Sequence, residues 1–301
     1  AAFGRRALKI AEDGIAKAAA LLGVTETAPI DFYVYPDETS FREILGPGTR
    51  ENVGGVAFPD IRTLVAQITP SQLDDPWVGI VIPHELTHLV FDTATSNPYH
   101  GPPHWLNEGL AVYLSQGFDS GDHSDVSGAI RAGTLMPLPA LDGQFPTFGD
   151  RFSLAYAESV SAIDFMVRTY GQPALVQLIR SYAEGRTDDE AFKAALGVDV
   201  TGFEAAWIAD LGTTEPVAIG PKPDPPGPIP PGWEAGAPTP GSATAVPAGP
   251  GSPVPTSGGA SIGDLVTTAI ITAVVVLGII GLVALGVRRR REPPPPPPMP
   301  G

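Results

Sequence analysis

The sequence predicts an α+β fold, in which a small mixed β-sheet is followed by a helical C-terminal subdomain. Short runs rich in Val, Ile, Phe and Tyr between residues 30 and 68 have the composition of strands. From residue 77 to residue 211, apolar residues recur at the three-to-four spacing of helices. Strands followed by a run of helices favour this fold class over a regularly alternating one.

The N-terminal part begins with an Ala-rich amphipathic segment that predicts a helix over residues 4–22, ended by Gly23. A strand is expected over residues 30–35. Pro36 and Asp37 then have the residue types that begin a helix, and this short helix should run to Leu45.

Two further strands, over residues 53–58 and 61–68, should be joined by a tight turn at Pro59 and Asp60. The rest of the globular region reads as helical. The helices are expected over residues 77–92, 105–116, 123–132, 153–170, 172–184, 187–196 and 200–211.

Composition divides the chain into four parts. Residues 1–215 mix apolar and charged residues and are long enough to bury a core. Residues 216–260 contain 14 Pro and 9 Gly with few large apolar side chains. Such a stretch cannot offset its ordering entropy, so we expect a disordered, semi-rigid linker. A transmembrane helix is predicted over residues 261–287, followed by a basic, Pro-rich tail over 288–301.

The transmembrane prediction depends on the stretch from Leu265 to Val287, which carries no charged residue. At ~1.5 Å per residue it would span roughly 34 Å, enough to cross the hydrocarbon core of a bilayer. Four arginines follow directly, at positions 288–291. Because such charge marks the cytoplasmic side, we expect a single-pass protein of the cell membrane, with its globular domain extracytoplasmic and its C-terminus cytoplasmic. Residues 1–23 lack the apolar run of an export signal, so that signal is expected upstream.

Charge and cysteine content exclude several classes of function. Residues 1–215 carry 13 Lys and Arg against 29 Asp and Glu, a net charge of −16, which makes nucleic acid an unfavourable partner. The chain has no cysteine, which excludes disulfides, thiolate metal sites and a cysteine nucleophile. Any metal ligands must therefore be His, Asp or Glu. The sequence carries no signal for the oligomeric state.

The strongest signal for chemistry is the segment His84-Glu85-Leu86-Thr87-His88, which has the pattern H-E-x-x-H. On a helix, residues four apart lie one turn above each other, so His84 and His88 can direct their imidazoles at one point. Glu85 would then lie close to a bound metal without binding it, where it can accept a proton from water.

A second segment, Trp105-Leu106-Asn107-Glu108-Gly109-Leu110-Ala111-Val112-Tyr113, begins the next predicted helix. A catalytic zinc requires three protein ligands and one open position for water. Glu108 can supply the third ligand, because the loop between the two helices allows the chain to turn back.

Together, the two segments resemble the gluzincin zinc metallopeptidases, and most closely the peptidase MA-like group. The spacing between His88 and Glu108 is similar to that of thermolysin-like enzymes, whereas the residues around Glu108 are more similar to those of aminopeptidase N-like enzymes. The resemblance implies a zincin-like fold with one Zn²⁺ per chain bound by His84, His88 and Glu108. It also implies that Glu85 is the general base in peptide-bond hydrolysis.

Family members use a later Tyr or His to stabilise the oxyanion, and Tyr156 is the candidate here. His123, Tyr113 and His104 are the alternatives. His104 is otherwise expected either next to the metal ligands or at the surface, and the surface position is favoured. One feature departs from the thermolysin pattern: Val112 stands where an Asp orients a histidine ligand. Candidates for that orienting role are Asp164, Glu158, Asp92 or a backbone carbonyl.

The substrate is expected to be a peptide or protein that binds along Gly55, Val56 and Ala57, where gluzincins have an edge strand. This segment lacks the glutamate with which aminopeptidase N-like enzymes bind a substrate amine. The resemblance therefore favours an endopeptidase over an aminopeptidase. The alternative is a catalytically inactive zincin-fold module that binds partners at the cell surface.

Overall fold

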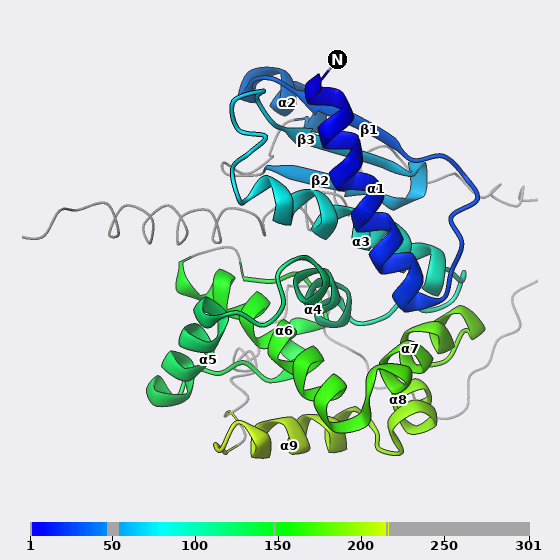
Figure 1. Ribbon diagram of the computed structural model, residues 1–301. Coiled ribbons are helices and arrows are strands. Elements are labelled where there is room, and N and C mark those ends of the chain that lie inside the picture. The colour runs from blue at the N-terminus through cyan, green and yellow to red at the C-terminus, as the bar shows by residue number, and fades with distance from the viewer. Residues whose placement is uncertain (1, 47–53, 147–148, 215, 217–301) are drawn as a thin grey trace, which may run out of the picture.

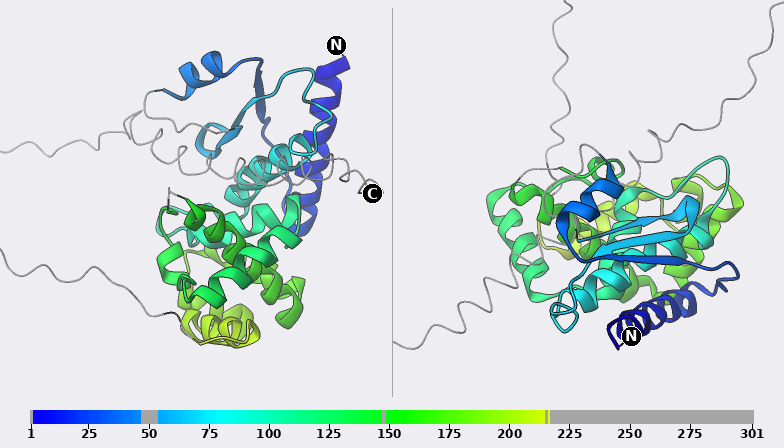
Figure 2. Two further views of the ribbon diagram at one scale, coloured as in Figure 1. Left: turned by 90° about the vertical axis from the view of Figure 1, so that its left-hand side faces the viewer. Right: turned by 90° about the horizontal axis from the view of Figure 1, so that it is seen from above.

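In a computed structural model, residues 2–46, 54–146, 149–214 and 216 are described. They form a helix-rich α+β fold with one small sheet, which confirms the predicted fold class (Figure 1). The sheet and its helices occupy one half of the molecule, and the later helices occupy the other (Figures 1 and 2). The helices are α1 Ala2–Leu22, α2 Glu38–Leu45, α3 Val78–Thr95, α4 His104–Ser115, α5 Ser120–Ala132, α6 Asp150–Tyr170, α7 Gln172–Ser181, α8 Asp188–Leu196 and α9 Val200–Asp210.

The sheet contains β1 Asp31–Tyr35, β2 Gly55–Phe58 and β3 Thr63–Gln67 in the order β1-β3-β2. β1 pairs parallel to β3, and β2 pairs antiparallel to β3, so the sheet is mixed as expected. A short 3₁₀ turn, Pro59–Ile61, connects β2 to β3. β2 is therefore an edge strand, with one side of its backbone directed away from the sheet.

The two faces of the sheet bury different side chains, as the alternation along a strand requires. On one face, Ala57 and Leu64 belong to the main core, and α3 packs against β2. On the other face, Val56 and Val65 pack against Phe41 of α2 in a smaller core. The sheet therefore lies between α2 and α3.

The two halves meet where α3 packs against α4, which in turn packs against α6. α4 is buried on nearly every face, which is typical of a helix at the centre of a core. At Gly109 the backbone of α6 approaches so closely that a Cβ would lie 2.6 Å from the Ser159 carbonyl oxygen. Glycine thus allows α4 to seat deeply against α6.

Several element boundaries differ from those predicted. The helix expected to end at residue 92 continues to Thr95, and the helix predicted over 172–184 is α7 followed by the 3₁₀ turn Tyr182–Glu184. Pro83 lies inside α3, where it packs against Gly14 of α1. The third strand is shorter than expected because β3 starts only after the left-handed residue Arg62.

The predicted linker over 216–260, the transmembrane helix over 261–287 and the tail over 288–301 lie outside the described residues, apart from residue 216. Within the part of the chain that is described, no helix is both long and apolar enough to cross a membrane.

Candidate metal centre and active site

Two central helices bring the site residues together. α3 carries His84, Glu85 and His88, and α4 carries Glu108. The connecting loop is fixed by Asn97, whose side-chain amide donates to the Tyr182 carbonyl at 2.7 Å. The packing of α3 against α4 therefore determines the position of Glu108 relative to His84 and His88.

His84, His88 and Glu108 form a compact group of potential ligand atoms. The two Nε2 atoms are 3.2 Å apart, and Glu108 Oε2 lies 3.4 Å from His84 Nε2 and 3.6 Å from His88 Nε2. Two ligands at ~2.1 Å from a tetrahedral zinc ion would be about 3.4 Å apart. The three distances are close to this value, so the group fits a zinc ion.

Burial gives a second indication of a cation site. All three side chains are buried, and neither carboxylate oxygen of Glu108 has a hydrogen-bond partner among the described residues. Burial raises the pKa of Glu108 well above its ordinary value, and the neighbouring Glu85 raises it further. A buried carboxylate without donors is costly, and a divalent cation would offset that cost.

The histidines are in the protonation state that metals bind. Burial, and then the neighbouring His88, lower the pKa of His84 well below its usual range. Burial lowers the pKa of His88 to about 4. Both imidazoles are therefore neutral near pH 7, with lone pairs available to a metal.

Glu85 is held by the edge strand. The backbone N–H of Ala57 donates to Glu85 Oε2 at 3.0 Å, whereas Oε1 has no hydrogen-bond partner in the described segments. Burial raises the pKa of Glu85 to about 8, although the Ala57 hydrogen bond opposes this shift. One oxygen is thus fixed, and Oε1 is the oxygen that can accept a proton once the carboxyl is ionised.

Asn107 orients His88, a contact that the sequence analysis did not anticipate. His88 Nδ1 lies 2.8 Å from Asn107 Oδ1. Because an amide oxygen only accepts, Nδ1–H must donate, which leaves the Nε2 lone pair directed at the candidate site. The sequence could have suggested this contact, since Asn107 directly precedes Glu108 on the helix that faces α3.

The side chains considered as substitutes for the missing Asp, which would orient a histidine ligand, have other interaction partners. Val112 itself is buried among apolar residues. Glu158 accepts the backbone N–H of Met136, and Asp164 pairs with Arg168. Asp92 lies one turn after His88 and lines the cleft beside the site, where it interacts electrostatically with Asp60, Arg62 and Glu26.

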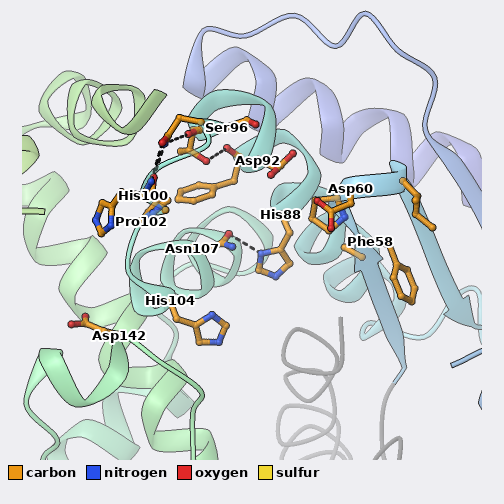
Figure 3. Close-up of a pocket in the computed structure, with 17 residues that line it drawn as sticks. Phe58, Asp60, His88, Asp92, Ser96, His100, Pro102, His104, Asn107 and Asp142 are labelled. Carbon is orange, nitrogen blue, oxygen red and sulfur yellow. Dashed lines mark hydrogen bonds between the residues drawn. The ribbon is translucent and has the colours of Figure 1, made fainter. Parts of the chain in front are cut away.

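A cleft of about 480 Å³ opens beside the candidate metal centre. Figure 3 shows His88, Asn107 and His104 on the helices, with Phe58 and Asp60 opposite them. The cleft is lined by part of β2 and its turn, the second half of α3, the loop to α4, and the start of α4.

The three predicted substrate-binding residues have different surroundings. Ala57 lines the cleft. A Cβ at Gly55 would lie 3.1 Å from Glu85 Cγ, so glycine allows β2 to approach the Glu85 side chain. The Val56 side chain packs on the opposite face of the sheet, so only its backbone could take part.

Of the candidates for the oxyanion donor, Tyr156 is buried on α6 with its ring against Phe145 and Phe152, at 4.9 and 5.1 Å between centroids. Its catalytic role remains a prediction. His123 is exposed on α5, and Tyr113 lines a separate groove beside α1. Of the two positions considered for His104, the structure has the one beside the candidate ligands: α4 begins at this residue, and its side chain is 16% exposed and lies against Glu108.

The fold and the site define an α+β domain with a buried His-His-Glu group that is compatible with a metal ion. A family model described as Peptidase MA superfamily matches residues 10–212, so the chain belongs to this superfamily. No curated protein and no solved structure matches the chain.

Proposed function

We propose that this protein is a zinc-dependent peptidase of the gluzincin type, with His84, His88 and Glu108 as metal ligands. The observation that carries the proposal is the buried group of three ligand atoms beside Glu85, in a chain of the Peptidase MA superfamily. When bound, zinc would polarise the scissile carbonyl and lower the pKa of a coordinated water.

The residues of the chain then have separate tasks. Glu85 Oε1 accepts a proton from the attacking water while Oε2 stays fixed by the Ala57 N–H, and Glu85 later passes the proton to the leaving amine. Asn107 keeps His88 in the tautomer that a metal requires. Tyr156 is retained as the candidate donor to the oxyanion.

A substitution of the general base tests this mechanism. Glu85→Gln should bind zinc as the wild type does, because the side chain is not a ligand, but should lose peptide hydrolysis by at least about 100-fold. Metal content and hydrolysis of a peptide library would be measured together on the full chain. Full activity in Glu85→Gln would contradict the mechanism.

We further propose an endopeptidase rather than an aminopeptidase. The edge strand β2 presents backbone groups along the cleft. Among the described residues of β2 and its turn, the only carboxylate that lines the cleft is Asp60, which lies in the turn and not on the strand where aminopeptidase N-like enzymes bind a substrate amine. A peptide and its N-acetylated form distinguish the two activities. An endopeptidase should cleave both at similar rates, whereas an aminopeptidase should cleave only the form with a free amine.

Membrane attachment with the domain outside the cytoplasm is also a proposal, supported by the uncharged run over 265–287 and the arginines after it. The full chain should fractionate with membranes, and a chain ending at residue 260 should not. The alternative function, a surface module that binds metal but does not cleave, would be favoured if the wild type bound zinc and hydrolysed no peptide.

A further inference from the structure

His104 lies against the carboxylate of Glu108 from within the same helix. The two residues are four apart, so their side chains share one face of α4. His104 Nε2 is 3.5 Å from Glu108 Oε1, whereas the other oxygen, Oε2, faces His84 and His88. The two carboxylate oxygens therefore have different neighbours.

The imidazole of His104 is held in place rather than free at the surface. Its side chain is only 16% exposed, and its ring meets Phe145 edge to face at 4.6 Å between centroids. The backbone N–H of His104 also donates to the Asp142 carbonyl at 3.1 Å. This packing limits the positions that Nε2 can adopt relative to Glu108.

We propose that His104 is a positioning residue, whose Nε2–H holds Glu108 Oε1 and so keeps Oε2 directed at the metal. The inference rests on the proposed function, because it takes Glu108 to be a metal ligand. The 3.5 Å separation is longer than a normal hydrogen bond. Neither atom has another hydrogen-bond partner among the described residues, so a small movement of either side chain would pair them.

A fourth-ligand role for His104 fits the geometry less well. The ligand atoms of His84, His88 and Glu108 all lie within 4.8 Å of one another, and His104 is outside that group. It contacts the carboxylate oxygen that faces away from the two histidines. A fourth protein ligand would also fill the position that a catalytic zinc leaves open for water.

The test compares zinc affinity in the full chain and in four variants by competition with a chelator, with Glu108→Ala as the reference for the loss of a ligand. His104→Ala should weaken zinc binding about 10- to 100-fold, the usual effect of losing a group that orients a ligand. His104→Gln should restore most of the affinity, because its amide N–H can reach Oε1. His100→Ala is the matched control, since His100 lines the same cleft but pairs with Asp188.

The absorption bands of Co²⁺ bound in place of zinc add a readout that a purely structural role would not change. They should shift in His104→Ala and return in His104→Gln. Unchanged affinity and bands in His104→Ala would overturn this inference alone. Loss of metal as complete as in Glu108→Ala would make His104 a ligand and overturn it too. A wild type that binds no metal would overturn both this inference and the proposed function, whereas metal binding without hydrolysis would overturn only the latter.

Discussion

Replacement of Gly109 by Ala perturbs the crossing of α4 and α6 directly beside Glu108. The added Cβ would lie 2.6 Å from the Ser159 carbonyl oxygen and 2.8 Å from its carbonyl carbon. The first distance is about 0.8 Å short of ordinary van der Waals contact. Both partners are helix backbone and cannot rotate away, so the helices must separate.

The expected cost follows from two opposing effects. Overpacking of a core typically costs about 1–3 kcal/mol, whereas Gly→Ala in a helix gains up to about 1 kcal/mol. Gly79, on the exposed side of α3, has no atom within 4 Å of an added Cβ. Gly79→Ala is therefore a matched control that should show only the gain.

Urea unfolding of the full chain measures the free energy of unfolding of both variants. Gly109→Ala should be less stable than Gly79→Ala by about 1–3 kcal/mol, and it should bind zinc more weakly because Glu108 moves with α4. Equal stability of the two variants would refute the close crossing of α4 and α6 as a determinant of the site.

Three further predictions concern other contacts. Asn107→Ala should weaken zinc binding about 10- to 100-fold by chelator competition, because His88 loses the acceptor that orients it, and unchanged affinity would contradict this role. Ala57→Pro removes the N–H that holds Glu85. Because this N–H donates to Glu85, kcat should fall about 10- to 100-fold with zinc content unchanged. Burial raises the pKa of Glu158 from 4.5 to about 8 in the folded protein. Its stabilising contribution is thus complete below pH 4.5 and lost as the pH rises toward 8. The free energy of unfolding of the wild type, measured in urea, should therefore fall relative to that of Glu158→Gln between pH 5 and 9, by up to about 4 kcal/mol. The same pH dependence in both proteins would contradict the raised pKa of Glu158.

The sequence predicted the fold class and the grouping of the candidate ligands because both depend on local patterns. A spacing of four on a helix places His84 and His88 together in any fold that preserves the helix. The helical run after residue 77 and the strands before it were equally readable from apolar periodicity. The same information placed Glu108 on the next helix.

The remaining features depend on tertiary contacts that no local pattern encodes. The Asn107 contact with His88 and the Ala57 N–H on Glu85 arise only when α3 meets α4 and β2. The position of His104, beside the ligands or at the surface, could not be decided from the sequence, because it stands just before the helix predicted from Trp105. Its ring packs against Phe145, which is 41 positions later in the chain, so this contact could not be predicted from a local pattern.

The metal content of the purified full chain, measured by elemental mass spectrometry beside Glu108→Ala, tests the central claim most directly. The proposed site predicts about one zinc per wild-type chain and a clear reduction in the variant. Wild-type protein without bound metal, even after exposure to zinc and removal of the excess, would contradict the metal centre and the peptidase mechanism built on it.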